Sequence, residues 1–155
     1  MADSNRTEPS SKPPAVLNAM MTLFLKTPLI QNAIGKQLAL LSFTGRRSGK
    51  LYTIPISYQR RGDSVFMMTK KSRSWWRNFA DQPAVELRLA GKVVSGTAEA
   101  HVGSEQDLAE VVDFLTSRPR DAKAYGVVAL TDGSPDPESV RGLLPGNVIV
   151  RVELD

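Results

Sequence analysis

Two short basic turns carry the side chains of this sequence that are best suited to bind an anion. The first, at residues 46–50, contains two arginines and a lysine, and its Gly49 allows the backbone to turn tightly. The second, at residues 70–73, leads directly into Trp75 and Trp76. Guanidinium and ammonium groups bind phosphates and carboxylates, while an indole offers a flat face to an aromatic ring. The two turns together indicate a ligand that is both anionic and aromatic.

Both features also have a plainer interpretation. A basic turn that contains glycine is common on protein surfaces and often has no ligand. The glycine spacing at residues 44–50 does not match the Walker loop of nucleotide-binding proteins, and no helix is expected to follow it. We expect one of the two tryptophans to anchor the core and the other to face a ligand.

The positive charge of the chain is concentrated in one block. The formal net charge is +4, but residues 36–92 hold twelve lysines and arginines against three acidic residues, which is a local charge of +9. Such a block favours an anionic partner, either a phosphate, a polycarboxylate, a nucleic acid or a lipid headgroup, over a merely solvated surface. Aromatic residues make up only 6% of the chain and the aromatic motifs of RNA-binding sheets are absent, so we expect no nucleic-acid partner.

The composition excludes several kinds of active site. The chain has no cysteine, which rules out disulfides, thiolate nucleophiles and iron–sulfur clusters. Its single histidine, His101, cannot build a histidine-rich metal site, and we expect no metal ion. His101 has no partner histidine or acid in the pattern, so we expect it to be structural or exposed. If the protein is an enzyme, we expect a bound cofactor to carry the reaction.

The N-terminal segment is expected to form a tail and a helix. Residues 1–14 are polar and rich in serine and proline, which predicts a disordered tail. Residues 15–34 repeat apolar side chains at a helical period that Pro28 interrupts, which predicts a kinked amphipathic helix or two short ones. The sequence of residues 1–34 fits neither a membrane-spanning helix nor a signal peptide. We therefore expect a cytoplasmic protein whose N-terminal helix covers its own core or lies on a membrane surface.

Beyond residue 35 the pattern changes to short strands. It predicts six of them, at residues 38–44, 53–59, 65–69, 84–89, 93–101 and 147–154. Residues 74–80 and a segment that Ser104 caps and that ends before Pro119 predict helices, and residues 132–137 predict a loop. The short connections rule out parallel crossovers, so we expect a mainly β (α+β) fold. This is one domain over residues 15–155, a small antiparallel barrel with two or three helices besides the N-terminal one.

A hairpin signal, Gly62-Asp63, relates the two basic turns in space. If the strands on either side of it pair, residues near Pro55 lie across from residues near Thr69. Both basic turns then lie toward the same end of the sheet, which strengthens the prediction of a shared ligand.

Part of the chain resembles a known family. The run LSFTGRRSGKLYTIPISY at residues 41–58, followed by Gly62-Asp63, WWRNF at residues 75–79 and Pro83, is similar to the deazaflavin-dependent nitroreductases of actinobacteria. The likeness covers residues 15–89 well and the remainder in outline. It implies a split β-barrel of the FMN-binding kind and coenzyme F-420, an 8-hydroxy-5-deazaflavin with a phospholactyl-oligoglutamate tail. That polyanionic tail would account for the basic block.

The resemblance also implies which residues hold the coenzyme. They lie in the first turn and the strand after it, in the second turn, and at the helix start that follows: Arg46, Arg47, Ser48, Gly49, Lys50, Tyr52, Pro55, Thr69, Lys70, Lys71, Trp75 and Asn78. The first turn would hold the phosphate and tail, and the second would meet the deazaflavin ring. Tyr52 stands where the family often has arginine. Tyr125 could donate a proton near the pocket or be an ordinary surface tyrosine.

The activity that the resemblance implies is hydride transfer from reduced coenzyme F-420 to a small electron-poor acceptor: a quinone, an enone or a nitro compound. Nitroreduction as such is not implied, because the segment between Lys71 and Trp75 is shorter than in the nitroimidazole-reducing members and their substrate-facing tyrosines are missing. FMN is the alternative cofactor. The alternative function is a non-catalytic split barrel that binds a flavin, haem or fatty acyl ligand. We expect a monomer or a homodimer.

Overall fold

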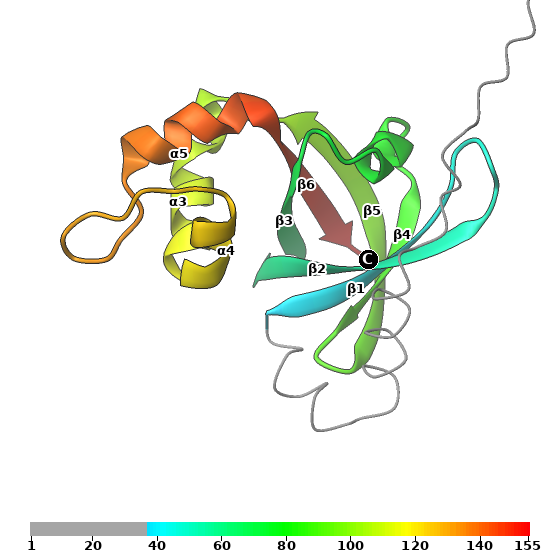
Figure 1. The fold of residues 1–155 in the computed structure, drawn as a ribbon. Helices are drawn as coiled ribbons and strands as arrows, with labels where there is room; N and C mark the ends of the chain where they lie inside the picture. Colours follow the sequence, from blue (N-terminus) through cyan, green and yellow to red (C-terminus); the bar gives the residue numbers. More distant parts are fainter. Residues whose placement is uncertain (1–36) are drawn as a thin grey trace, which may run out of the picture.

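Residues 37–155, which this computed structural model describes, form a six-stranded antiparallel barrel with helices on one side (Figure 1). The strands are β1 Leu38–Thr44, β2 Leu51–Arg61, β3 Ser64–Lys70, β4 Ala84–Leu89, β5 Lys92–Val102 and β6 Asn147–Leu154. They close in the order β1-β2-β3-β6-β5-β4, and β4 pairs back to β1. The six strands and their antiparallel barrel confirm the fold predicted from the sequence.

Three of the sequence predictions fall elsewhere in the chain. The disordered tail, the N-terminal helix and its membrane contact concern residues 1–34, which lie outside the described residues. Among residues 37–155, no helix is long and apolar enough to cross a membrane. The same residues contain no cluster of three or more histidine, aspartate or glutamate side chains that could hold a metal ion.

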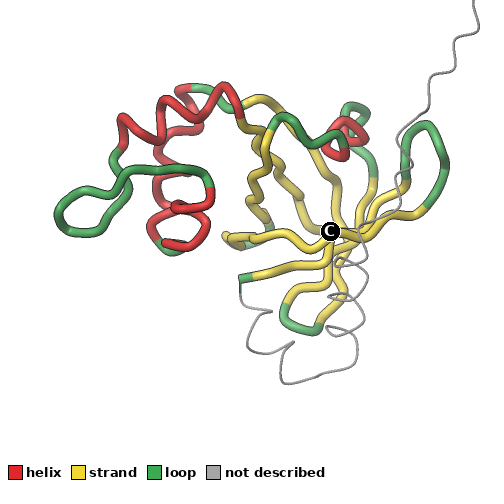
Figure 2. The backbone as a smooth tube through the Cα atoms, viewed as in Figure 1, coloured by secondary structure: helices red, strands yellow, loops and turns green. Residues whose placement is uncertain are grey.

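Helices α3, α4 and α5 gather on one side of the barrel, whereas the short helix η1 lies apart from them (Figure 2). The helices are η1 Trp75–Phe79 after β3, then η2 Glu105–Asp107, α3 Leu108–Thr116 and α4 Pro119–Ala124 after β5, and α5 Pro137–Leu143 and η3 Leu144–Gly146 before β6. The helix expected after Ser104 is confirmed, because Ser104 and Asp107 form a reciprocal capping box. Helix α5 was not predicted. Its start carries ordinary signals: Asp136 accepts a hydrogen bond from the N–H of Glu138, and Pro137 takes the first position.

Alternation along the strands produces two apolar layers. Val65 and Met67 belong to the layer inside the barrel, whereas Phe66 and Met68 belong to the layer under the helices. In that outer layer the ring of Phe114 on α3 lies 5.0 Å from the ring of Phe66. The helices are thereby fixed against the outer face of the barrel.

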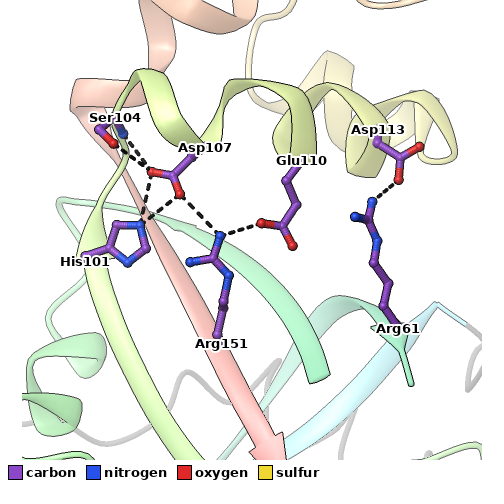
Figure 3. Close-up of polar contacts among 7 residues, drawn as sticks. All are labelled: Arg61, His101, Ser104, Asp107, Glu110, Asp113 and Arg151. Atoms are coloured by element: carbon purple, nitrogen blue, oxygen red, sulfur yellow. Dashed lines mark hydrogen bonds and ion pairs between the residues drawn. The ribbon is translucent and has the colours of Figure 1, made fainter. Parts of the chain in front are cut away.

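An ionic cluster also ties the helices to the barrel (Figure 3). Asp107 is buried and accepts hydrogen bonds from His101 on β5, at 3.0 Å, and from Arg151 on β6, at 3.3 Å. Arg151 also pairs with Glu110 on α3. The expectation that His101 has no acidic partner is wrong, because the capping residue Asp107 folds back over the end of β5.

This cluster is expected to make the folded state sensitive to acid. Burial by itself raises the pKa of Asp107, but hydrogen bonds from His101, Ser104 and Arg151 outweigh burial and bring this pKa below its ordinary value. The stabilisation is therefore present above the ordinary carboxyl pKa and is lost as the pH falls through the folded-state pKa. We expect the free energy of unfolding in urea to fall toward acid, and to fall less steeply in Asp107→Asn. Equal slopes for the two proteins would contradict this account.

Candidate functional site

The barrel opens between β2 and β3. Both strands continue past Tyr58 and Met67, but this pair is the last one in their ladder. Pro55 lies on the part of β2 beyond the ladder and has no N–H to donate to a neighbouring strand. Proline is typical of strand edges for this reason, and here it stands where β2 leaves β3. We call this opening the split.

Tyr125 supplies a donor at the split. The N–H of Tyr58 donates to the carbonyl of Gln37, at 3.1 Å, on the β1 side of β2. The polar backbone groups of Met68, the next residue on β3, therefore face β2. The ladder has ended there, and the Met68 carbonyl accepts a hydrogen bond from the Tyr125 hydroxyl instead, at 2.9 Å. Since Tyr125 directly follows α4, this bond ties the helical side to the open edge of the barrel.

A cleft of about 440 Å³, which we call the split cleft, lies at this opening. Apolar side chains of β2 and α3, among them Ile54 and Phe114, form part of its lining. Five of the residues predicted from the sequence also line it: Pro55, Thr69, Lys70, Trp75 and Tyr125. The structure thus brings together residues of the second basic turn, the first tryptophan and the candidate proton donor.

The prediction missed other residues of the split cleft. Arg73 lines it beside Lys70, and Asp121 lines it from α4. Arg73 could have been found, because it belongs to the same basic turn as Lys70 and Lys71. Asp121 gave no signal, since the pattern did not predict α4. The Met68 carbonyl is a backbone group and has no signature in a sequence.

The positive side chains of the two basic turns and η1 form no ion pair with an acidic residue of the described part of the chain. Every ion pair within residues 37–155 involves Arg61, His101, Arg118, Arg141 or Arg151. Seven basic side chains of the two turns and η1 are exposed and outside these pairs: Arg46, Arg47, Lys50, Lys70, Lys71, Arg73 and Arg77. Their charge is therefore available to an anion from outside.

None of the residues of the first basic turn lines the split cleft, and Asn78 links the turn to it. The N–H of Arg46 donates to the side-chain oxygen of Asn78 at 2.8 Å, and the Asn78 amide donates to the carbonyl of Trp75 at 2.8 Å. Asn78 thus connects the first turn to η1, whose first residue lines the cleft. Each basic turn is thus tied to η1, but only the second one reaches into the cleft. The β2–β3 ladder that was expected to relate them ends at Tyr58 and Met67, before Pro55 and Thr69.

Other predicted residues give the first turn its shape. Gly49 has a φ of +65°, and a Cβ at Gly45 would lie 2.5 Å from Ser48 Oγ and 2.7 Å from the Tyr52 ring. The Tyr52 ring stacks on Phe43 with 5.7 Å between ring centroids, and its hydroxyl lies 3.2 Å from Ser48 Oγ. The conformation of the first basic turn therefore depends on Gly49 and on the contact between Ser48 and Tyr52.

The two tryptophans differ in what they face. Both pack against the core of the barrel, but only Trp75 also lines the split cleft. The Trp75 ring packs against Phe43 and Phe79, with centroid distances of 6.1 Å and 5.7 Å. The indole N–H of Trp76 donates to the carbonyl of Lys71 at 3.3 Å, which ties the second turn to η1.

Comparison with known proteins finds a matching protein family and several solved structures of similar fold. Residues 24–129 match the family described as F420H(2)-dependent quinone reductase. No curated protein matches the chain. Several solved structures are similar at low identity, so their likeness concerns the fold.

Three of these solved structures are the most useful for comparison. A protein of unknown function from Agrobacterium tumefaciens is 17% identical with a TM-score of 0.54; the match covers 95% of this chain but only 58% of the Agrobacterium protein. An F420-H2 dependent reductase, FDR-A, is 20% identical with a TM-score of 0.52, covering 76% of this chain and 95% of that one. A FAD and heme binding protein from Mycobacterium smegmatis is 16% identical with a TM-score of 0.51, covering 82% of this chain and 65% of that one.

Proposed function

Because the chain belongs to the F420H(2)-dependent quinone reductase family, we propose that it reduces a small electron-poor acceptor with the deazaflavin coenzyme F-420. The acceptor is a quinone, an enone or a nitro compound. The observation that carries this proposal is the split cleft, which combines an aromatic and apolar lining with basic side chains that have no acidic partner among the described residues.

The residues around the split cleft fit such a coenzyme chemically. Trp75 and Ile54 offer apolar surface to a tricyclic ring, while Lys70 and Arg73 place positive charge in the same cleft. A phospholactyl-oligoglutamate tail carries several negative charges, and it needs cations that are not already neutralised. The exposed basic side chains of the two turns and η1 meet that need. The apolar lining therefore suits the ring of the coenzyme, and the basic side chains suit its tail.

The chain contributes to the reaction by binding and orientation. When bound in its reduced form, the coenzyme supplies two electrons and a proton as a hydride equivalent. Pro55, Thr69 and Trp75 bind the ring and exclude water from it. The tail is bound by Arg46, Arg47, Lys50, Lys70 and Lys71, and the turn that presents the first three is shaped by Ser48, Gly49, Tyr52 and Asn78.

Solvent water supplies the further proton that the acceptor needs. Tyr125 is the donor that the sequence suggests, but its hydroxyl donates to the Met68 carbonyl at 2.9 Å. Burial is the largest cause that raises the pKa of Tyr125 to about 12; the Asp121 carboxylate adds to the rise and Arg73 opposes it. A phenol with this pKa is a weak acid at neutral pH, and its proton is already engaged. Tyr125 is therefore assigned to holding the split cleft in shape.

Removing the Asn78 side chain should weaken coenzyme binding modestly. In Asn78→Ala the first turn loses its hydrogen bond to η1, and one such bond contributes about 0.5–1.5 kcal/mol. We expect the dissociation constant of the coenzyme, followed by fluorescence titration, to rise by about 3- to 10-fold. Gln59→Ala is the matched control, because it also removes a side-chain amide that forms a hydrogen bond, in this case to Asp113. Equal effects of the two substitutions would contradict the role of Asn78.

A second function has support from one likeness. The Mycobacterium smegmatis protein that shares this fold is described as binding FAD and heme. The same cleft could therefore hold a flavin, with FMN as the alternative cofactor, or haem or a fatty acyl ligand, and turn nothing over.

Turnover separates the two functions. Reduced coenzyme F-420 is mixed anaerobically with a catalytic amount of the full-length protein and a panel of quinones, and coenzyme oxidation is followed by absorbance. We expect oxidation that depends on both protein and quinone. Saturable coenzyme binding without oxidation by any quinone would favour the binding function. If FMN copurifies with the protein and the deazaflavin does not bind, the protein would still be an oxidoreductase, but the choice of coenzyme F-420 as its cofactor would be overturned.

A further inference from the structure

A second cleft, of about 500 Å³, adjoins the split cleft, and we call it the Arg118 cleft. It lies where β1 begins and where α3 gives way to α4. Its polar lining includes Ser57, Ser117, Arg118 and Arg120. The two clefts share three lining residues, Leu38, Ser57 and Asp121. A small molecule in the Arg118 cleft would therefore lie directly beside whatever occupies the split cleft.

Arg118 is a buried cation that several contacts hold in place. It is only 7% exposed. Its Nη1 donates to Ser117 Oγ at 2.8 Å, its Nη2 donates to the Tyr58 carbonyl, and its guanidinium lies 4.5 Å from the centre of the Phe114 ring. Its Nε has no hydrogen-bond partner among residues 37–155, and the carboxylate of Asp121 lies 4.0 Å from that nitrogen. The chain thus holds the guanidinium in place but leaves its Nε–H without a hydrogen-bond acceptor among residues 37–155.

The lining of the Arg118 cleft suits an oxygen atom that bears negative charge. It contains the guanidinium groups of Arg118 and Arg120 against the single carboxylate of Asp121. Arg120 is exposed and forms no ion pair within the described part of the chain. Ser57 adds a hydroxyl group to the lining, whereas the Ser117 hydroxyl already donates to the Phe114 carbonyl at 3.0 Å. N–H and O–H donors bind an anionic oxygen more strongly than a neutral one.

We infer that the Arg118 cleft binds the electron acceptor, a quinone or an enone, through an oxygen that carries negative charge. The inference rests on the proposed function, since the acceptor must lie beside a coenzyme in the split cleft. A quinone oxygen gains negative charge as the quinone is reduced. The guanidinium groups in the lining of the cleft therefore stabilise the charged form more than the neutral acceptor.

A pair of probes and a pair of variants test the inference by binding alone. The probes are a hydroxynaphthoquinone whose hydroxyl is ionised at neutral pH and its neutral methyl ether. Both are titrated into the full-length protein without coenzyme, and the Nε–H resonance of Arg118 is followed by NMR. Arg118 itself is kept, because it contacts Ser117, the Tyr58 carbonyl, Phe114 and Asp121, and its loss would disturb the fold. The variant is Arg120→Gln, and the matched control is Lys123→Gln, an exposed cation of the same helix outside both clefts.

We expect the anion to bind about tenfold more tightly than the ether and to shift the Arg118 resonance. This preference should fall in Arg120→Gln and persist in Lys123→Gln. Equal affinities for the two probes, or an undiminished preference in Arg120→Gln, would overturn the inference. Coenzyme binding is measured separately by fluorescence. If the coenzyme does not bind while the preference for the anion is intact, the proposed function fails and the anion site stands.

Discussion

Reversing the charges of Lys70 and Arg73 together is expected to raise the dissociation constant of the coenzyme by about 100-fold. Both side chains line the split cleft and neither pairs with an acid among residues 37–155. In Lys70→Glu/Arg73→Glu, two attractive interactions with the anionic coenzyme become repulsive. Fluorescence titration of the coenzyme into the purified variant measures the effect.

The control for this experiment is Lys92→Glu. Lys92 is an exposed cation of the same basic block, but it is the first residue of β5 and lines neither cleft. We expect its reversal to change the dissociation constant by less than about threefold at moderate salt. If Lys92→Glu weakens binding as much as the double reversal, the net charge of the protein explains the attraction. That result would contradict a specific role of Lys70 and Arg73 in the split cleft.

Replacing Tyr125 by phenylalanine is expected to lower the free energy of unfolding by about 1–3 kcal/mol. The substitution removes the hydroxyl that donates to the Met68 carbonyl at the split. Because burial raises the pKa of Tyr125 to about 12, its stabilising contribution is present below the ordinary pKa of tyrosine and is lost as the pH rises through the folded-state pKa. Urea denaturation at neutral and at alkaline pH measures both effects.

Thr116→Val is the matched control for Tyr125→Phe. Thr116 also donates its hydroxyl to a backbone carbonyl, that of Val112 at 2.7 Å, but at an exposed position on α3. We expect its loss to change the free energy of unfolding by less than about 0.5 kcal/mol. The pH profile of coenzyme oxidation near neutrality should be unchanged in Tyr125→Phe if solvent supplies the proton. Loss of a basic limb from that profile, with stability unchanged, would contradict the assignment and make Tyr125 the proton donor.

The barrel was predictable because its strands are local features. Each strand alternates or repeats apolar residues and ends at a turn signal, such as Gly62 with a φ of +60° between β2 and β3. The split was not predictable in the same way. It depends on where a ladder stops and on Tyr125, which arrives from a helix that the pattern did not predict. Long-range contacts of this kind leave no periodic trace in a sequence.

The candidate site was predictable in part for a similar reason. Lys70 ends β3 and Trp75 begins η1 after the second basic turn, so their position at this end of the strand came from the sequence pattern alone. The first basic turn joins β1 to β2, and its link to η1 goes through the Asn78 amide. The resemblance implied Asn78 as a coenzyme contact, whereas the structure places it between Arg46 and Trp75. The partner of His101 was missed because Asp107 reaches it only after the chain reverses at the helix start.

We propose that a deazaflavin with a polyanionic tail binds in and beside the split cleft. The most direct test is an equilibrium titration of coenzyme F-420 into the purified full-length protein, followed by coenzyme fluorescence at low and at high salt. The account predicts saturable binding with a dissociation constant on the order of micromolar, which weakens as salt screens the tail. Absence of saturation at micromolar coenzyme, or an affinity indifferent to salt, would contradict it.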